Sequence, residues 1–297
     1  MKPLYLSFIP TLAVSLLVGC GGGGSSISEP TGSPHLVSAD ARIISPKLMA
    51  LVGSDIYLAN QGNSGLNGVL KINGADQLAS VGFSGLTDAI GVAANSAGTV
   101  FISGKPTSAI PGILNLNTGS PLANSVGSHY GLLFAPNDDL IAPSVNLTKR
   151  VGVSSASTSY ASWSAVNITD TPLALVKKGN FVYISTQENR IYKFDLTNIP
   201  ATPLALNLTG LSLESPSGIA FDGDTMYVVN YGPNGGASSW IAKITNESVV
   251  SEFKRDPNWL CASAGVAVRD NYIYVSNGTS TAPGCGNIQN TIVKFFH

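Results

Sequence analysis

The chain has 297 residues, of which 44% are hydrophobic and only 11% are charged, and its formal net charge is −1. Because there is no excess of Lys and Arg to neutralise phosphates, the composition argues against a nucleic-acid partner. After the N-terminal leader and the Gly/Ser/Pro-rich segment that follows it, about 260 residues remain, which is enough for one domain with a large core.

Residues 1–19 have the pattern of a secretory signal peptide. Lys2 supplies a positive charge, and Leu4–Val18 is mostly apolar but too short to predict a membrane-spanning helix. The segment ends in Leu-Val-Gly-Cys, which resembles the lipoprotein box of bacteria. This resemblance implies that Cys20 is lipidated, and several acyl chains on one residue hold a protein stably at a membrane. An ordinary signal peptide with an incidental cysteine is the alternative.

Residues 20–36 are rich in Gly, Ser and Pro and are predicted to form a flexible tether. The residue after the cysteine is Gly21 rather than Asp, and by the sorting rule of enteric bacteria this resemblance implies the outer membrane. We therefore expect an exported, monomeric protein, lipid-anchored at the outer membrane and facing the periplasm or the cell surface.

Residues 37–297 contain six copies of one strand pattern, spaced about 40 to 50 residues apart. The clearest copy is Ser215–Asn230, in which two apolar runs flank an Asp-Gly pair that is typical of a tight hairpin turn. Third and fourth strands are predicted at 240–245 and 249–253. First strands begin near Leu48, Gly91, Gly131, Leu173, Gly218 and Gly265, and the matching second-strand residues are Tyr57, Phe101, Ile141, Tyr183, Tyr227 and Tyr274.

Six four-stranded units at this spacing predict an all-β fold, a six-bladed β-propeller with antiparallel blades. The last copy reaches His297 directly after its third strand, so we expect the run Ala41–Ser45 to supply its fourth strand and close the ring. The third copy, Gly131–Ser154, departs most from the pattern because Pro136 and Pro143 lie in or beside its strands.

Two segments carry a family resemblance. GIAFDGDTMYVVN, residues 218–230, and ENRIYKFD, residues 188–195, resemble NHL repeats and the related SMP-30/gluconolactonase-like propellers. The resemblance covers residues 41–297 and implies the same propeller fold.

Two cysteines remain beyond Cys20. Cys261 precedes the first strand of the last copy, and Cys285 lies between its second and third strands. These two connections emerge on the same face of a propeller, so we expect a disulfide in an oxidising periplasm. Two free thiols or a metal pair are the alternatives.

The loops on that face predict a polar ligand-binding mouth at the end of the central channel. Its candidate residues follow second strands or precede first strands: Asn60, Asp88, His129, Thr186, Asn230 and Asn277. Amide and carboxylate oxygens suit a divalent cation such as Ca²⁺. Alternatively, the Asn side chains cap loops and strand ends.

Two functions are considered. The first is a non-catalytic propeller that binds a protein, peptide or glycan, with no resident cofactor and no assigned catalytic residue. The second is a metal-dependent lactonase or hydrolase of the SMP-30 type, or a lyase of the virginiamycin B lyase type. The SMP-30 resemblance implies a Glu, Asn and Asp metal set, of which only Asp88 has a comparable place, since Leu48–Leu51 stands where the Glu is expected. The lyase resemblance makes His129 a candidate base, with Asp88 as its partner.

Overall fold

The computed structural model describes residues 29–61, 68–81, 88–104, 112–122, 130–135, 137–144, 150–154, 166–168, 170–198, 202–283 and 285–297. The regular elements among these residues are β-strands and two short 3₁₀ turns at Asn234–Gly236 and Gly286–Ile288. Within these ranges no helix is long and apolar enough to span a membrane.

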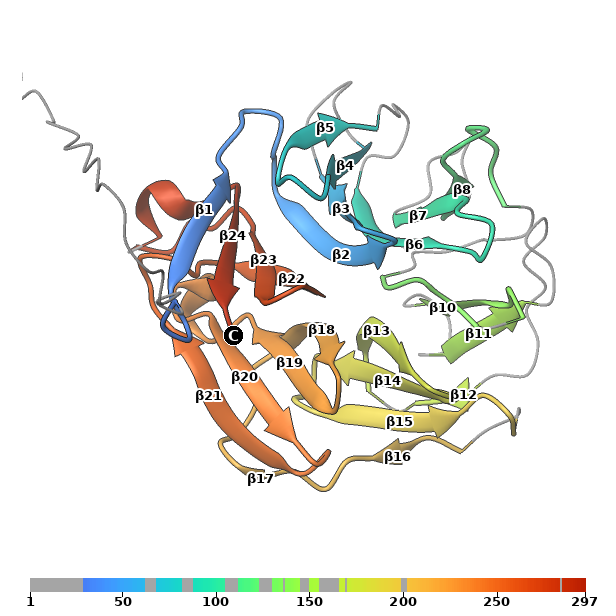
Figure 1. The fold of residues 1–297 in the computed structure, drawn as a ribbon. Helices are drawn as coiled ribbons and strands as arrows, with labels where there is room; N and C mark the ends of the chain where they lie inside the picture. The colour runs from blue at the N-terminus through green and yellow to red at the C-terminus, as the bar shows by residue number, and fades with distance from the viewer. Residues whose placement is uncertain are drawn as a thin grey trace, which may run out of the picture.

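The strands form six sheets around a central axis (Figure 1). In chain order, the first sheet contains β2 (Pro46–Val52), β3 (Asp55–Asn60), β4 (Gly68–Ile72) and β5 (Leu78–Ser80), and the second contains β6 (Ala89–Ala94), β7 (Val100–Gly104) and β8 (Ile113–Asn115). The third sheet contains β9 (Leu133–Phe134), β10 (Leu140–Ser144), β11 (Arg150–Ser154) and β12 (Val166–Asn167), and the fourth contains β13 (Pro172–Lys178), β14 (Phe181–Thr186), β15 (Ile191–Asp195) and β16 (Leu204–Ala205). The fifth sheet contains β17 (Thr209–Gly210), β18 (Pro216–Asp222), β19 (Thr225–Asn230), β20 (Trp240–Thr245) and β21 (Val249–Arg255), and the sixth contains β22 (Ser263–Arg269), β23 (Tyr272–Asn277), β24 (Thr291–Phe296) and β1 (Pro34–Ser38).

The all-β propeller predicted from the repeat is confirmed. Five of the sheets have four or five strands and are complete blades, whereas the sheet of the second copy has three strands, β6 to β8, among the described residues. An isolated bridge between Leu114 and Pro121 follows β8 in place of a fourth strand. The prediction of six four-stranded blades is therefore met only in part.

The recurring glycine of the first strands lies where two blades touch. A Cβ atom on Gly265 would lie 2.4 Å from the carbonyl oxygen of Lys47, and one on Gly91 would lie 2.1 Å from that of Tyr130. Such distances leave no room for a side chain. The glycines therefore allow the backbone of the next blade to pass close by.

The hydrophobic core is divided into clusters between neighbouring blades. Ile56 and Leu58 of β3, for example, pack with Tyr274 of β23 and Ile292 of β24, so the first and last blades share one cluster. Each blade thus buries its faces against its neighbours rather than within itself.

The strand that closes the ring is β1, and the prediction that Ala41–Ser45 does so is wrong. Pro34 pairs with Phe295 and Leu36 with Val293, antiparallel, and Figure 1 shows β1 beside β24. Ile43 is 2% exposed and fills the core shared by the first and last blades. Ser45 has a φ of 45°, which a strand does not accommodate. Residues 34–36, expected in the tether, therefore belong to the propeller.

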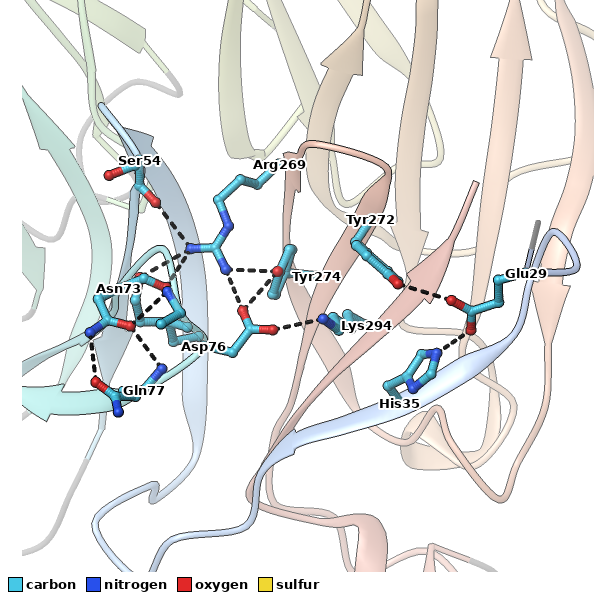
Figure 2. Close-up of polar contacts among 12 residues, drawn as sticks. Glu29, His35, Ser54, Asn73, Asp76, Gln77, Arg269, Tyr272, Tyr274 and Lys294 are labelled. Carbon is cyan, nitrogen blue, oxygen red and sulfur yellow. Dashed lines mark hydrogen bonds and ion pairs between the residues drawn. The ribbon is translucent and has the colours of Figure 1, made fainter. Parts of the chain in front are cut away.

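A buried arginine joins the last blade to the first on the side away from the predicted mouth (Figure 2). Arg269, at the end of β22, is 6% exposed. Its Nη1 donates to the carbonyl oxygens of Ser54 (3.0 Å) and Asn73 (2.8 Å), and its Nη2 donates to Asp76 and to the Tyr274 hydroxyl (2.7 Å). We call these five residues the closure cluster.

Lys294 of β24 adds a second cation to the closure cluster. Its Nζ lies 2.7 Å from Asp76 and 4.0 Å from the centre of the Tyr272 ring. Burial alone would raise the pKa of Asp76, but hydrogen bonds from Lys294 and Tyr274 hold that pKa below its usual value. Beside it, Figure 2 shows Tyr272 donating to Glu29, which also pairs with His35 of β1.

Candidate functional site

The central channel widens at both ends into cavities. The cavity at the start of the inner strands, here called the mouth, measures about 310 Å³, and the one at the far end measures about 470 Å³. An apolar waist lies between them, lined by residues such as Met49, Leu132 and Ile219. The mouth is lined by Lys47, Leu48, Gln61, Ile90, Tyr130, Leu173, Ser217, Tyr231, Ala262, Ala264, Gly278 and Thr279.

A β-bulge near the start of five inner strands aims one side chain per blade into the mouth. In β6 the register passes from Ala89 to Gly91, so that Ile90 is the extra residue, and in β18 Ser217 is extra in the same way. Bulges re-aim side chains in this manner. Register shifts occur at the same place in β2, β13 and β22, and Tyr130 precedes β9. The resulting ring is Lys47, Ile90, Tyr130, Leu173, Ser217 and Ala264.

Buried serines hold two of these ring positions. Ser276 Oγ accepts a hydrogen bond from the Gly265 amide of its own blade (2.8 Å) and donates to the carbonyl oxygen of Lys47 in the next blade (2.8 Å). Ser103 Oγ accepts from Gly91 and donates to the carbonyl oxygen of Tyr130 (2.8 Å). The backbone of Lys47 and of Tyr130 is therefore fixed by the preceding blade.

The predicted residues at the ends of second strands are not in the mouth. Asn60 is 0% exposed, and its Oδ1 accepts from the amide of Ile44 (2.8 Å) while its Nδ2 donates to the carbonyl oxygen of Arg42 (3.0 Å). Its side chain thus fastens the loop that precedes β2. This is the capping alternative considered from the sequence.

Asn277 and Asn230 do the same in their own blades, and both are 0% exposed. Asn277 Oδ1 accepts from the Cys261 amide (3.2 Å) and its Nδ2 donates to the carbonyl oxygen of Trp259 (2.9 Å). Asn230 Oδ1 accepts from the amide of Glu214 (2.9 Å). The prediction that these amides line an open mouth is therefore wrong.

Thr186, predicted for the same role, is also 0% exposed. Its hydroxyl lies 3.3 Å from a carboxylate oxygen of Asp170 and 3.2 Å from the carbonyl oxygen of Arg190. The Arg190 guanidinium pairs with the same Asp170 at 3.2 Å. Thr186 is thus part of a buried polar contact within its blade.

The prediction missed the mouth by one residue. Gln61, Tyr231 and Gly278 directly follow Asn60, Asn230 and Asn277, and all three line the mouth. Successive strand residues face opposite sides, so a shift of one residue exchanges a buried amide for a lining side chain.

The two remaining candidates have different outcomes. Asp88 lies half-buried just ahead of β6, outside the lining of the mouth, and accepts a hydrogen bond from Gln61 Nε2. His129 lies outside the described residues, next to the lining residue Tyr130. The described ranges contain no group of three or more His, Cys, Asp or Glu side chains that could hold a metal ion.

Lys47 is a charged lining residue that the sequence analysis did not predict. It is half-buried, and burial lowers the pKa of its ammonium, an effect that the negative charge of Asp88 opposes. Lys47 directly precedes Leu48, where the first strand of the first copy was predicted to begin, and this position was the available signal. Residues ahead of a first strand were considered as mouth residues in the second and third copies, but not in the first copy.

The rim of the mouth is braced by Cys261 and Cys285, which are joined as a disulfide with their Cα atoms 5.4 Å apart. The two cysteines and Ala262 are buried together, and Tyr231 packs against them. Because Ala262 and Tyr231 also line the mouth, the bridge supports one wall of it. Formation of this bridge in the exported protein stays a prediction.

No protein-family model and no curated protein matches the chain. Similar solved structures include a candidate gluconolactonase, 11% identical, covering 89% of this chain and 92% of that one with a TM-score of 0.63. An auxiliary nutrient binding protein from Bacteroides thetaiotaomicron is 12% identical over 84% of this chain and 68% of that one, with a TM-score of 0.62. Inactive virginiamycin B lyase from Staphylococcus aureus with quinupristin is 14% identical over 89% and 99%, with a TM-score of 0.57. These likenesses show the propeller fold alone.

Proposed function

We propose that this propeller is a binding protein whose mouth holds a glycan or a peptide without transforming it. The observation that carries the proposal is the ring of six residues, five at the bulges of inner strands and Tyr130 ahead of β9, which gives the mouth one side chain from each of the six sheets. A cavity of about 310 Å³ with aromatic, apolar and a few polar groups has the make-up of a small-ligand site.

The lining also favours binding over catalysis. Hydrolysis or elimination by acid–base chemistry needs a carboxylate or imidazole within reach of the substrate. The described residues that line the mouth include neither. Lys47, Gln61 and Thr279 instead offer groups that orient a ligand.

A thermal-shift screen of the full chain against saccharides and short peptides tests the proposal. A ligand at one hundred times its dissociation constant adds about 2.7 kcal/mol, which raises the melting temperature by several degrees. We expect Tyr231→Ala to abolish that rise. Leu51→Ala is the matched control, because Leu51 is 46% exposed and lines the cavity at the far end. If the ligand-induced rise in melting temperature is lost in Leu51→Ala but kept in Tyr231→Ala, the ligand does not bind in the mouth.

The second candidate is a lyase or hydrolase. One observation favours it: Tyr130 lines the mouth, and His129 is the residue next to it. The same thermal-shift screen with Ca²⁺, Mg²⁺, Mn²⁺ and Zn²⁺ distinguishes the catalytic function from the binding function. A rise with one cation that is lost in Asp88→Ala or His129→Ala would make the catalytic reading the stronger one.

We also propose that the protein is a lipid-anchored component of the bacterial cell envelope. The leader that ends at Cys20 and the bridge between Cys261 and Cys285 support export to an oxidising compartment. Labelled palmitate should enter the wild-type protein and not Cys20→Ser. Equal labelling of both would refute the anchor.

The three-stranded sheet β6 to β8 is proposed to be a sixth blade. Its inner strand β6 contributes Val92 to the lining of the far cavity, together with residues of the other inner strands, such as Val52 and Val266. An experimental structure that shows a fourth strand on β8 would establish this, and one without it would not.

A further inference from the structure

We propose that the mouth recognises an acidic sugar, with its carboxylate paired to Lys47 and its hydroxyls donating to the surrounding oxygen atoms. This inference rests on the proposed binding function and names the chemical class of the ligand.

The ammonium of Lys47 has no counterion among the described residues. It makes no hydrogen bond or ion pair with the residues that the structure describes. Of the seven other described lysines, five lie within ion-pair distance of a carboxylate, namely Lys71, Lys178, Lys193, Lys254 and Lys294. A half-buried ammonium without a partner loses hydration and gains nothing in return, so a bound anion would relieve that cost.

The nearby carboxylate of Asp88 does not fill this role. Gln61 Nε2 donates to Asp88 Oδ1, and Ser45 Oγ donates to Gln61 Oε1 at 3.2 Å, so Gln61 is held beside the aspartate. Lys47 has no ion pair with Asp88, whose charge reaches it only at longer range. The mouth therefore keeps one positive charge available to a ligand.

The hydroxyls around Lys47 are already used as donors. Ser217 Oγ donates to the carbonyl oxygen of Ser263 (3.0 Å), and the Tyr231 hydroxyl donates to that of Gly235 (3.1 Å). Each of these oxygens keeps lone pairs that can accept. They suit a ligand that brings its own O–H donors.

The Thr279 hydroxyl must act as a hydrogen-bond donor, because the Asn290 oxygen that it contacts also accepts a hydrogen bond from another group. Asn290 Oδ1 accepts from the Ser45 amide at 2.7 Å, which identifies that atom as the oxygen, and Thr279 Oγ1 lies 2.9 Å from it. The Thr279 hydroxyl must therefore donate to Asn290, leaving its oxygen as an acceptor toward the mouth.

The chemistry of the lining thus combines one cation, several acceptors and apolar faces. Tyr130, Ile90 and Leu173 supply apolar surface beside Lys47. A sugar ring has C–H faces for such surface and hydroxyls for the acceptors, and a uronic acid adds the carboxylate. A neutral sugar would leave Lys47 unpaired, and a simple fatty acid would leave the acceptors unused.

Three probes test this assignment on the full chain by isothermal titration calorimetry. Methyl β-D-glucuronide has both the hydroxyls and the carboxylate, methyl β-D-glucoside lacks the carboxylate, and cyclohexanecarboxylate lacks the hydroxyls. We expect the glucuronide to bind at least about tenfold more tightly than either of the others. In Lys47→Met the preference for glucuronide over glucoside should fall to about twofold or less.

Two further variants complete the experiment. Lys47→Arg keeps the positive charge and should keep most of the preference, and Lys177→Met alters a lysine of the far cavity and should leave it unchanged. Unfolding temperatures of all variants show whether each is folded.

The outcomes separate this inference from the function on which it rests. Equal binding of glucuronide and glucoside, or a preference that survives in Lys47→Met, overturns the acidic sugar, while loss of that binding in Tyr231→Ala still supports a site in the mouth. If none of the three probes binds at millimolar concentration, the acidic-sugar assignment is wrong. The thermal-shift screen against saccharides and short peptides then decides whether the mouth binds a ligand at all.

Discussion

The inner strands β2 and β22 lie side by side and have a buried or half-buried cation at opposite ends. At the far end Arg269 of β22 donates to three carbonyl oxygens, to Asp76 and to Tyr274. At the mouth Lys47 of β2 has no such partner among the described residues. The same pair of strands thus carries one charge that is satisfied by the fold and one that is not.

The difference indicates where the molecule is held together and where it is open to a ligand. A buried charge with several partners is strongly destabilising to disrupt, because removing one partner leaves the others buried and unpaired. A charge without partners contributes nothing to the fold and is free to bind. A substitution of Arg269 should therefore change the free energy of unfolding, whereas a substitution of Lys47 should change the affinity for a ligand.

Arg269→Met is expected to have the largest effect on stability. It removes the donor that joins Asp76 to the carbonyl oxygens of Ser54 and Asn73, and we expect a loss of about 3–5 kcal/mol in the free energy of unfolding. Urea unfolding monitored by fluorescence measures this. The control is Arg255→Met, whose side chain is 38% exposed and which should cost about 1 kcal/mol or less. Equal losses would show that the closure cluster does not hold the ring.

The bridge at the rim of the mouth should come next. Cys261 and Cys285 are 24 residues apart in sequence, and replacing both by Ser should cost about 3 kcal/mol through the entropy of the unfolded chain. Adding a reductant to the wild type should lower its melting temperature to that of the variant. Two reactive thiols in protein isolated from cells, with no effect of the reductant, would favour the free-thiol alternative.

Asp76→Asn tests the closure cluster through pH. The folded-state pKa of Asp76 is lowered, so its contribution is present above the ordinary value of about 3.9 and is lost as the pH falls through the folded value. We expect the variant to be about 1–3 kcal/mol less stable than the wild type at pH 7, because charged hydrogen bonds are lost. The gap should begin to shrink below about pH 4, where the carboxyl of the unfolded chain takes up a proton, and should close only below the lowered pKa of the folded state.

Asp55→Asn is the matched control for that experiment, since Asp55 makes a single ion pair of 3.0 Å with Lys71 near the surface. Its gap from the wild type should stay small at both pH values. A gap for Asp76→Asn that is the same at pH 3 and pH 7 would mean that its charge is not what matters.

Of these variants, Lys47→Met should have the smallest effect on stability and the largest effect on ligand binding in the mouth. Folding lowers the pKa of Lys47, so at neutral pH its charge is less favourable in the folded state than in the unfolded chain. Methionine keeps the apolar stem and removes that charge. We expect an equal or slightly higher melting temperature, measured by calorimetry. A clear drop would reveal that the fold does use the ammonium.

The propeller could be predicted because its signals are local. The hairpin predicted around Asp222-Gly223 is present: Asp222 pairs with Thr225, the two turn residues between them are Gly223 and Asp224, and Gly223 has a φ of 52°. The first, second and third strands of the clearest copies also lie where the pattern placed them. The closing strand could not be predicted in this way. The run around Ile43 is apolar because it fills a core between blades, and a pattern of apolar residues does not distinguish that role from a strand.

The mouth could be predicted only to within a residue. A bulge adds one residue to the inner strand and changes which side chain faces the channel, and its place depends on contacts with the next blade, such as that of Ser276 with Lys47. Nothing in the spacing of the repeats records that extra residue. The strand-end Asn residues drew attention because they are polar, yet they are polar in order to hold loops.

The pairing of β1 with β24 ties the order of synthesis to the order of folding. β1 is synthesised before the other strands, and its partner β24 spans Thr291–Phe296, so the ring stays open until the chain has been made as far as β24. Intermediate blades assemble from neighbours in sequence, whereas closure requires the most distant contact in the domain and comes late for that reason. A shortened chain without β24 would therefore lose the seam rather than a single blade, and would expose the sides of both blades that meet there.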